Sequence, residues 1–319
     1  MTPEPRIAAF LERAGHGGAP CSMLAGDASN RRYLRVGGMV LMDAPAEKGE
    51  DVRPFLDVTR RLRAGGFSAP EVLAEDAEAG LLLLEDLGDA LFARVTGRVD
   101  EVALYEAAVD ALAGIQADVS ADGLPPYDEA TYLREARLLT DWYLPARGVS
   151  LQAAEIAAYE ALVAEACAAL KAAPVIVLRD YHAENLLWLP ERAGAARVGL
   201  LDYQDALAGH PAYDVVSLLE DARRDTSEEL QKAMIRRFLD RTGASEEAFA
   251  RAYAVLGAQR NLKIIGIFSR LDRRDGKPAY LAHQPRVWAH LQRDLAHPAL
   301  AGLRAWVARH VPAPEAVTA

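Results

Sequence analysis

The 319 residues are 51% hydrophobic and 26% charged, an ordinary globular composition, and this length favours two lobes or two domains. The net charge of −10 argues against nucleic acid or an anionic membrane surface as the main partner, although one or two local cations could still bind a phosphorylated ligand. No apolar run approaches the roughly 20 residues of a membrane span, and no leader begins the chain, so we expect a cytoplasmic protein.

The N-terminal part of the sequence predicts a short helix followed by strands. Residues 3–14 place their apolar side chains on one helical face. Residues 32–36 and 39–42 have strand patterns and are joined by Gly37-Gly38, which predicts a tight hairpin. The small residues 26–30 precede this hairpin, so their backbone N–H groups could approach phosphates. A plain hairpin with a mobile loop is the alternative.

A helix and two further strands complete the first predicted lobe. Residues 51–65 have helical periodicity, and residues 72–74 and 81–84 predict strands. The leucine strand 81–84 leads directly into the polar, glycine-containing segment 85–89, which indicates a hinge. We therefore expect an N-terminal nucleotide-binding lobe over residues 1–88 and a catalytic, substrate-binding lobe over residues 89–319.

The second part of the chain is mostly helical by periodicity, with predicted helices over residues 100–115, 132–143, 151–172, 226–243 and 246–271. Asp100 has the position of an N-cap, and Thr226 with Glu229 has the spacing of a capping box. Two apolar segments, 174–178 and 198–201, interrupt the helices as strands that a hairpin over residues 189–194 should join. The predicted class is α+β.

Three polar residues follow these two embedded strands. Asp180 comes after the first strand, Asn185 lies five residues later, and Asp202 comes directly after the second. An Asp that accepts the proton of a hydroxyl, together with an amide and a carboxylate that hold a cation, suits phosphoryl transfer. Asp and Asn occur five apart by chance in many proteins, so the two flanking strands and Asp202 carry the prediction.

The chain resembles the aminoglycoside phosphotransferase and choline-kinase-like branch of the protein-kinase fold, from Gly26 to about residue 295. The resemblance implies a bilobal kinase-like fold, with Asp180 as the catalytic residue and Asn185 and Asp202 as Mg²⁺ ligands. It also implies that Asp214 braces the catalytic loop. The residues that it implies for binding ATP are Ser29 and Asn30 in the phosphate flap, and the Glu85 carbonyl and Leu87 amide in the hinge.

Several segments closely resemble the bacterial anomeric kinases of cell-wall amino sugars, namely GDASNRRYLR, VLMDAP, LLLEDLGD, RDYHAENLLWL, GLLDYQDALAGHPAYDVVSLLEDAR, AQRNLKIIGIFSRL and DGKPAYLAHQPRVWAHL. This resemblance implies that ATP and Mg²⁺ are used to phosphorylate the C1 hydroxyl of N-acetylmuramate or N-acetylglucosamine during peptidoglycan recycling. It also implies that the sugar 1-phosphate passes to a uridylyltransferase without a stable complex.

The sequence departs from the kinase pattern in two places. The strand over residues 39–42 lacks the Lys that usually binds the phosphates, so we expect another cation there, with Lys48 as the first candidate and Arg31 and Arg32 as the next ones. Asp202 is followed by Tyr203-Gln204 rather than Phe-Gly, which makes a switching loop of the protein-kinase type doubtful.

The acceptor site can be predicted only as a set of suitable side chains. Trp142 and Tyr143 could stack on a sugar ring, although a pair of core aromatic residues is the equal alternative. Glu135, with its neighbour Arg134, and Asp205 could bind sugar hydroxyls. The lactyl carboxylate of N-acetylmuramate requires a cation, and the candidates that cannot be ranked are Arg179, Arg260 and Arg286.

Two alternatives remain open for the function. A kinase of the same class could act on an aminoglycoside, a choline-like alcohol or a hydroxylated amino acid. A non-catalytic nucleotide-binding scaffold would be compatible with the missing strand Lys, but it has no need of Asp180, Asn185 and Asp202 together. The preferred sugar, the anomer and the oligomeric state do not follow from the sequence.

Overall fold

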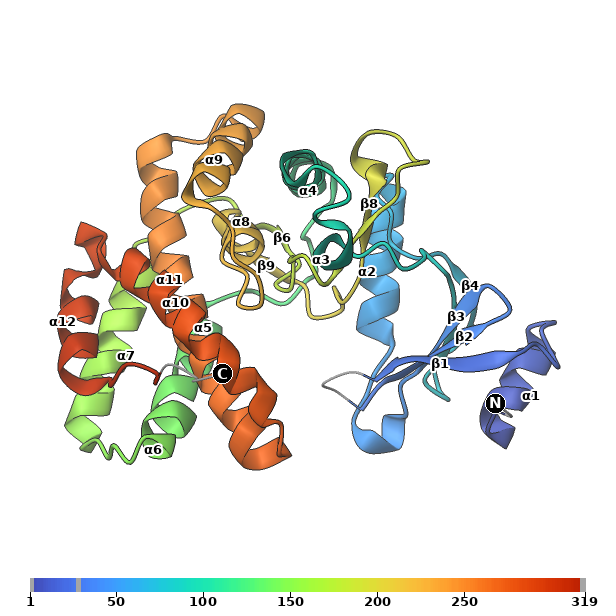
Figure 1. The fold of residues 1–319 in the computed structure, drawn as a ribbon, viewed down its shortest axis with the longest axis horizontal. Coiled ribbons are helices and arrows are strands. Elements are labelled where there is room, and N and C mark those ends of the chain that lie inside the picture. Colours follow the sequence, from blue (N-terminus) through green and yellow to red (C-terminus); the bar gives the residue numbers. More distant parts are fainter. Residues whose placement is uncertain (1–2, 27–29, 316–319) are drawn as a thin grey trace. The chain divides into compact units, whose positions relative to one another are not determined.

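The computed structural model describes residues 3–26 and 30–315, and the chain divides into two compact units (Figure 1). The first unit contains residues 1–119 and 184–206, and the second contains residues 120–183 and 207–319. The chain passes from the second unit into the first between Ala183 and Glu184, inside the segment that carries Asp180 and Asn185.

An antiparallel sheet of five strands, in the order β1-β2-β3-β5-β4, forms the main part of the first unit. Its strands are β1 (Cys21–Gly26), β2 (Arg32–Val36), β3 (Met39–Asp43), β4 (Val72–Asp76) and β5 (Leu81–Glu85). Val36 pairs with Met39, and Gly37 and Gly38 have φ values of 54° and 84°. A two-residue turn of this kind requires positive φ, so the predicted hairpin is confirmed.

Helix α1 (Pro5–Arg13) covers one face of this sheet, with Ile7, Phe10 and Leu11 buried in one cluster with Leu34 and Leu41 (Figure 1). The unit also contains the helices α2 (Arg53–Ala64), α3 (Phe92–Val95) and α4 (Glu101–Asp118), the 3-10 turns η1 (Ala46–Lys48) and η3 (Gly194–Arg197), and the hairpin β7 (Leu186–Trp188) and β8 (Val198–Leu200). Asp100 caps α4 as predicted, because its side chain accepts a hydrogen bond from the backbone N–H of Val102.

The second unit is helical and is built along the long helix α10 (Glu246–Asp275). Its other helices are α5 (Glu129–Ala136), the π-helix η2 (Leu139–Tyr143), α6 (Leu144–Ala146), α7 (Ala153–Ala168), α8 (Ala212–Leu219), α9 (Glu228–Thr242), η4 (Pro278–His283), α11 (Gln284–Leu295), η5 (Pro298–Leu300) and α12 (Ala301–His310). The short strands β6 (Val175–Val177) and β9 (Leu207–Gly209) pair antiparallel. Gly266 explains how α10 packs so closely, since a Cβ there would lie 2.3 Å from the backbone of Leu138.

The predicted α+β class is confirmed, with an antiparallel sheet in the N-terminal part and a larger helical C-terminal part. Two local predictions are wrong. The hairpin after residue 188 joins β7 to β8, whereas β6 pairs with β9, because the short strand Leu186–Trp188 has no periodicity that the sequence could reveal. Ser227 rather than Thr226 caps α9, since the Thr226 hydroxyl donates to the carbonyl of Leu219. A lobe boundary after residue 88 stays a prediction.

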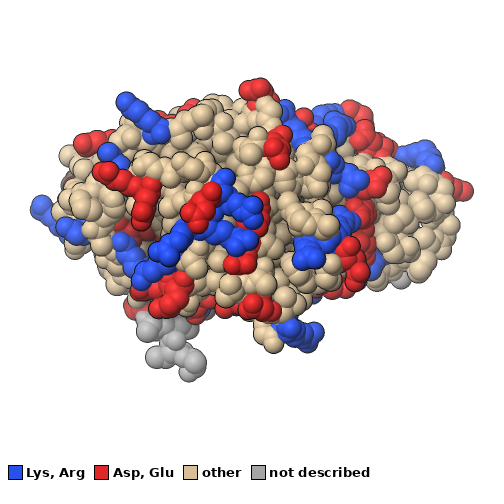
Figure 2. All heavy atoms as spheres, turned by 90° about the horizontal axis from the view of Figure 1, so that it is seen from above, with Lys and Arg blue, Asp and Glu red and all other residues tan. Residues whose placement is uncertain are grey.

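On the face shown in Figure 2, Lys and Arg side chains lie interspersed with Asp and Glu side chains. Exposed ion pairs such as Arg53–Glu78 and Lys232–Glu228 are typical of such a surface and contribute little to stability individually. Within the described ranges, no helix is both long enough and apolar enough to cross a membrane.

Candidate active site

Asp180 follows β6 in a loop that is held by the backbone of its two preceding residues. The Asp214 carboxylate accepts hydrogen bonds from the N–H groups of Leu178 (2.7 Å) and Arg179 (2.8 Å), and the Ser217 hydroxyl donates to the carbonyl of Arg179 (3.0 Å). Arg179 has a φ of 70°, a left-handed conformation that is costly for a residue with a side chain. The hydrogen bonds from α8 thus stabilise a strained residue directly before Asp180.

The Asp214 side chain is fully buried. Burial raises the pKa of this carboxyl group to about 7, although the two backbone N–H donors and the nearby Arg260 favour the ionised form. Because both oxygens accept N–H groups, the ionised carboxylate is the form that fits the loop. The loop's anchorage therefore depends on a carboxyl group that titrates near neutral pH.

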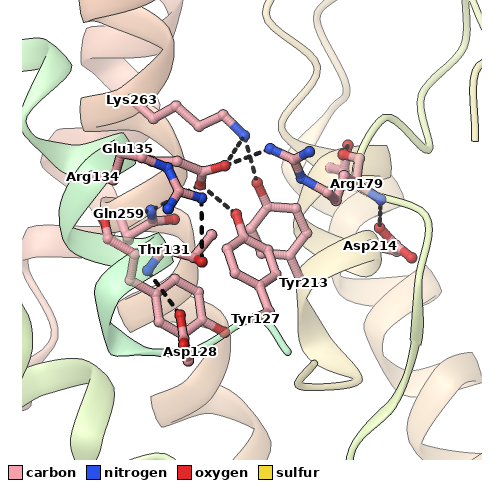
Figure 3. A network of polar contacts seen from close by, with 12 residues as sticks. Tyr127, Asp128, Thr131, Arg134, Glu135, Arg179, Tyr213, Asp214, Gln259 and Lys263 are labelled. Carbon is pink, nitrogen blue, oxygen red and sulfur yellow. Dashed lines mark hydrogen bonds and ion pairs between the residues drawn. The ribbon is translucent and has the colours of Figure 1, made fainter. Parts of the chain in front are cut away.

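A second anchor of this loop is Glu135 on α5 (Figure 3). Its Oε1 accepts hydrogen bonds from Arg179 Nη2 at 2.5 Å and from Lys263 Nζ at 3.0 Å. Its Oε2 accepts from the Tyr127 hydroxyl at 2.5 Å and from Gln259 Nε2 at 3.2 Å. The carboxylate is nearly buried, and these four donors join α5, the loop before Asp180 and α10 in one network.

The groups of this network remain charged around neutral pH. Burial alone would raise the pKa of Glu135, but Lys263 and Arg179 outweigh it and lower that pKa to about 2. Burial would lower the pKa of Lys263, but Tyr213 and Glu135 outweigh it and the pKa is raised. The pKa of Arg179 is raised by Glu135 despite burial. One carboxylate is therefore shared by two cations.

His182, two residues after Asp180, is buried. Burial lowers its pKa, although the carboxylates of Asp221 and Asp180 act in the opposite direction. A buried imidazole with a lowered pKa favours a structural role for His182.

The pairing of β7 with β8 brings Asn185 and Asp202 together in the first unit. Leu186 pairs with Leu200, the backbone N–H of Leu201 donates to the Asn185 carbonyl (3.0 Å), and Asn185 Nδ2 lies 3.5 Å from Asp202 Oδ2. Asp202 has a φ of 59°, the second strained non-glycine residue in the described chain. An amide oxygen beside a carboxylate is a hard donor set that suits Mg²⁺. Within the described ranges, no group of three or more His, Cys, Asp or Glu side chains is arranged to hold a metal ion.

The residues after Asp202 attach its loop to α2. Gln204 Nε2 donates to Asp202 Oδ1 at 2.7 Å. The Tyr203 ring stacks on Phe55, with centroids 5.1 Å apart, and its hydroxyl shares a 2.8 Å hydrogen bond with Thr59. These contacts give the Tyr203-Gln204 sequence a physical role in fixing Asp202.

A cavity of about 330 Å³ opens in the first unit, a volume that suits a small-molecule ligand. Its walls include side chains from β2, β3, β5, α2 and the hairpin, together with the segment after β5. The residues that line it include Tyr33, Val40, Met42, Phe55, Leu84, Glu85, Asp86, Leu87, Arg94, Asn185, Leu187, Leu201 and Asp202. The predicted hinge residues Glu85 and Leu87 and the predicted metal ligands Asn185 and Asp202 therefore line one cavity.

The side chain of Glu85 forms ion pairs with Arg192 (2.5 Å) and Arg63 (3.6 Å). Met42 lines the cavity on β3, the strand that carries the phosphate-binding Lys in the usual kinase pattern.

The predicted phosphate-binding residues are distributed differently. Ser29 lies outside the described residues, whereas Asn30 donates through its backbone N–H to Glu50 (3.0 Å) and through Nδ2 to the Lys48 carbonyl (3.1 Å). Arg32 forms ion pairs with Asp43 and Glu4, and none of Arg31, Arg32 and Lys48 lines the cavity.

Arg31 is the remaining cation of this segment. Its Nε donates to Glu50 at 2.8 Å, and both side chains are largely buried. Burial would lower the pKa of Arg31, but the hydrogen bond to Glu50 outweighs it and the pKa is raised, with smaller contributions from Tyr33 and Asp205. Arg31 is thus a charged group close to a cavity residue and to the loop that carries Asp202.

The predicted sugar-binding residues do not form one cluster. Glu135 and Arg179 bind each other, Arg260 is buried and donates to the Ser217 hydroxyl at 2.9 Å, and Arg286 is held by Asp225 and the Ala222 carbonyl. The other three are Tyr143, which is buried with its hydroxyl donating to the Pro312 carbonyl, Trp142, which is half-buried, and Asp205, which is exposed.

The sequence analysis did not identify four residues of this polar network, namely Lys263, Gln259, Tyr127 and Tyr213. The first two were detectable in part, since polar residues four apart on a helix that is otherwise largely apolar share one face and require a buried partner. The identity of that partner, Glu135, could not be foreseen.

Residues 21–253 match the model of the phosphotransferase enzyme family. The chain belongs to this family. The chain is 42% identical to the N-acetylmuramate/N-acetylglucosamine kinase of Caulobacter vibrioides over 97% of both chains. It is 40% identical to the enzyme of the same name from Pseudomonas aeruginosa, over 87% of this chain and 84% of that one. The chain is accordingly a phosphotransferase enzyme.

Solved structures of other phosphotransferases share the fold. A choline/ethanolamine kinase family protein from Mesorhizobium loti aligns with a TM-score of 0.64 at 17% identity, over 95% of this chain and 96% of that one. An ADP-bound aminoglycoside phosphotransferase aligns with a TM-score of 0.60 at 14% identity, over 91% and 97%. The expected kinase-like fold is confirmed, and at these identities the likeness concerns the fold alone.

Proposed function

We propose that this phosphotransferase transfers the γ-phosphoryl group of ATP to the C1 hydroxyl of N-acetylmuramate or N-acetylglucosamine. The observation that carries the proposal is the 42% identity, over 97% of both chains, to a relative named as a kinase of these two sugars. The family supports ATP as the phosphate donor. The C1 position follows from the resemblance to anomeric kinases.

In the proposed reaction Asp180 accepts a hydrogen bond from the sugar hydroxyl, orients its oxygen toward the γ-phosphorus and takes up the proton as the new O–P bond forms and the bond to ADP breaks. Asp214 and Glu135 act on this step through Arg179, by keeping the loop before Asp180 in one conformation. Asp180 belongs to the second unit, whereas Asn185 and Asp202 belong to the first.

Asn185 and Asp202 would hold Mg²⁺. When bound, Mg²⁺ would neutralise the negative charge of the phosphates while that charge moves toward the leaving ADP. Gln204 keeps one Asp202 oxygen in place through a 2.7 Å hydrogen bond, so the orientation of this ligand does not depend on the metal alone.

ATP would occupy the cavity of the first unit. We assign the adenine to the backbone of the segment after β5, with the Glu85 carbonyl and the Leu87 N–H as partners. Ser29 and Asn30 would approach the phosphates. The cation that replaces the missing strand Lys is Lys48, Arg32 or Arg31. We place Arg31 first, because its pair with Glu50 fixes the guanidinium near Tyr33, a residue that lines the cavity.

For the acceptor, Trp142 and Tyr143 stay proposed stacking residues, Asp205 a proposed partner of a hydroxyl, and Arg260 and Arg286 proposed cations. The product would be a sugar 1-phosphate in a cytoplasmic peptidoglycan-recycling route, and a uridylyltransferase would use it without forming a stable complex.

An acceptor panel tests the proposal. The protein is incubated with ATP, Mg²⁺ and either N-acetylmuramate, N-acetylglucosamine, choline or kanamycin, and ADP release is followed. We expect turnover with the two amino sugars and a phosphate on C1 in the ³¹P and ¹H NMR spectra of the product. Turnover with choline or kanamycin alone would contradict the sugar assignment, and no turnover with any acceptor would favour the scaffold.

A further inference from the structure

A chain of two hydrogen bonds reaches from helix α10 to the peptide group that attaches Asp180. Arg260 Nη2 on α10 donates to the Ser217 hydroxyl at 2.9 Å, and this hydroxyl donates to the carbonyl of Arg179 at 3.0 Å. Ser217 is fully buried on α8, and Arg260 is only 4% exposed. The chain therefore lies inside the second unit and links two helices with the loop before Asp180.

The direction of both bonds follows from the chemistry of the guanidinium. All N–H groups of an Arg side chain are donors, so the Ser217 oxygen must accept from Arg260. The single O–H of Ser217 is then directed at the Arg179 carbonyl, whereas a helical serine often donates to the carbonyl four residues earlier. Hydrogen bonds in such a series strengthen one another in a buried place. Arg260 thus fixes the direction in which Ser217 donates.

The carbonyl that receives this bond belongs to the peptide group between Arg179 and Asp180. The N–H of the same peptide group is also engaged, because Asp180 donates to the Leu178 carbonyl at 2.9 Å. Arg179 has a φ of 70°, a strained conformation that persists only while the surrounding contacts maintain it. A rotation of this peptide group would displace the carboxylate of Asp180.

The charge of Arg260 acts on the same loop through Asp214. Within the described part of the chain, Arg260 forms no ion pair with a carboxylate, and burial raises the pKa of Glu220, a nearby acid. Arg260 lowers the pKa of Asp214, whereas the charge of Asp180 raises it. The Tyr181 hydroxyl also interacts with Asp214 and stays uncharged, because burial raises its pKa. Arg260 therefore favours the ionised form of Asp214, which the two backbone N–H groups of the loop require.

We propose that Arg260 is a positioning residue for phosphoryl transfer, which orients Asp180 through the Ser217 hydroxyl and does not touch the sugar. This inference rests on the proposed function, in which Asp180 takes the proton of the sugar hydroxyl. A contact of Arg260 with the lactyl carboxylate is the competing role, and it would concern N-acetylmuramate alone. A positioning role concerns every acceptor equally, because it acts on the base rather than on the substrate.

Three variants separate the hydrogen bond from the charge. Ser217→Ala removes the hydrogen bond and keeps the charge, Arg260→Lys keeps the charge and changes the geometry, and Arg260→Met removes both. Steady-state kcat and KM are measured for each variant and the wild type with N-acetylmuramate and N-acetylglucosamine, together with the pH profile of kcat/KM.

Arg260→Met and Ser217→Ala should lower kcat about tenfold with both sugars and leave both KM values nearly unchanged, as expected for a lost buried hydrogen bond that does not touch the substrate. In Arg260→Met the acid midpoint of kcat/KM should also move to higher pH, by roughly 0.5 or more, because Asp214 loses a nearby positive charge. Ser217→Ala and Arg260→Lys should keep the midpoint of the wild type.

Arg251→Met is the matched control, since it removes an exposed positive charge from the same helix and should change neither kcat nor the midpoint. In Arg260→Met, a loss confined to N-acetylmuramate would assign the residue to the lactyl carboxylate and overturn the proposal, and an unchanged midpoint would reduce its role to a structural one. If Arg260→Met does not fold, a normal kcat in Ser217→Ala still refutes the proposal. Failure of the proposed function looks different, because the wild type would then phosphorylate neither sugar.

Discussion

The carboxylate of Asp214 accepts a 2.8 Å hydrogen bond from the backbone N–H of Arg179 while that residue has a φ of 70°. The same carboxylate accepts a 2.7 Å hydrogen bond from Leu178, so one buried side chain fixes two successive peptide groups before Asp180. Because burial raises the pKa of this carboxyl group to about 7, the shape of the loop is linked to pH.

Activity should therefore fall as the pH decreases through about 7, since protonation of Asp214 replaces an acceptor by a donor that faces an N–H group. Asp214→Asn should have lower kcat/KM and should lack this change, because an amide does not titrate. The measurement is the pH profile of kcat/KM for both proteins from about pH 5 to 9. If kcat/KM falls on acidification with the same midpoint in the wild type and in Asp214→Asn, the titrating group is not Asp214.

The raised pKa of Asp214 affects stability in the opposite direction, because lowering the pH should stabilise the fold while it lowers the activity. The folded-state pKa lies above the ordinary value of 3.8, so ionisation favours the unfolded state. The contribution of Asp214 to the free energy of unfolding should be largest below about pH 4 and should be lost as the pH rises to about 7. Urea unfolding at several pH values measures it, with Asp214→Asn as the reference in which the dependence is reduced.

Asp180→Asn should lower kcat by about 10²- to 10⁴-fold and leave the affinity for ATP nearly unchanged, because the amide cannot accept the proton of the sugar hydroxyl. Steady-state kinetics gives kcat, and calorimetric titration with a non-hydrolysable ATP analogue gives the affinity. A near-normal kcat would remove Asp180 from the proposed role.

Asp202→Asn should raise the Mg²⁺ concentration needed for half-maximal activity by at least about tenfold, since the variant loses a charged oxygen ligand. Mg²⁺ titrations of activity at fixed ATP measure this effect. Gln204→Ala should shift the titration in the same direction by less, because it frees Asp202 Oδ1 without removing it. An unchanged Mg²⁺ requirement in Asp202→Asn would contradict its assignment as a ligand.

Arg31→Met should weaken ADP binding by about tenfold and leave adenosine binding nearly unchanged, because only the diphosphate would meet the guanidinium. Lys48→Met should have a smaller effect on ADP. Calorimetric titration of both variants with ADP and adenosine makes the comparison. A larger and ADP-specific loss in Lys48→Met would return the role to Lys48.

Gly266→Ala should destabilise the second unit by about 1–3 kcal/mol, since the added methyl group would lie 2.3 Å from the backbone of Leu138 and α10 would have to move away. Thermal unfolding followed by circular dichroism measures this change. Gly243→Ala is an informative comparison, because its cost should come from a φ of 66° in open space rather than from a clash. Equal stability of Gly266→Ala and the wild type would show that the helix packing adapts without cost.

The sequence by itself determined the features that depend on neighbouring residues. Helical periodicity predicted α1, α2 and α4, the Gly37-Gly38 pair predicted the hairpin of β2 and β3, and the order Asp180, Asn185, Asp202 predicted a phosphoryl-transfer site. Such features follow from local backbone preferences and from the alternation of polar and apolar residues, which a sequence displays directly.

Only the tertiary structure decided which distant side chains meet. Glu135 binds Arg179, 44 residues away, and Lys263, 128 residues away, and no local pattern encodes either partner. The pairing of β6 with β9 and the choice of Ser227 as the cap of α9 also escaped prediction. The reason is that short strands and buried ion pairs are selected by the packing of whole elements, where each polar group must find a partner before it can be buried.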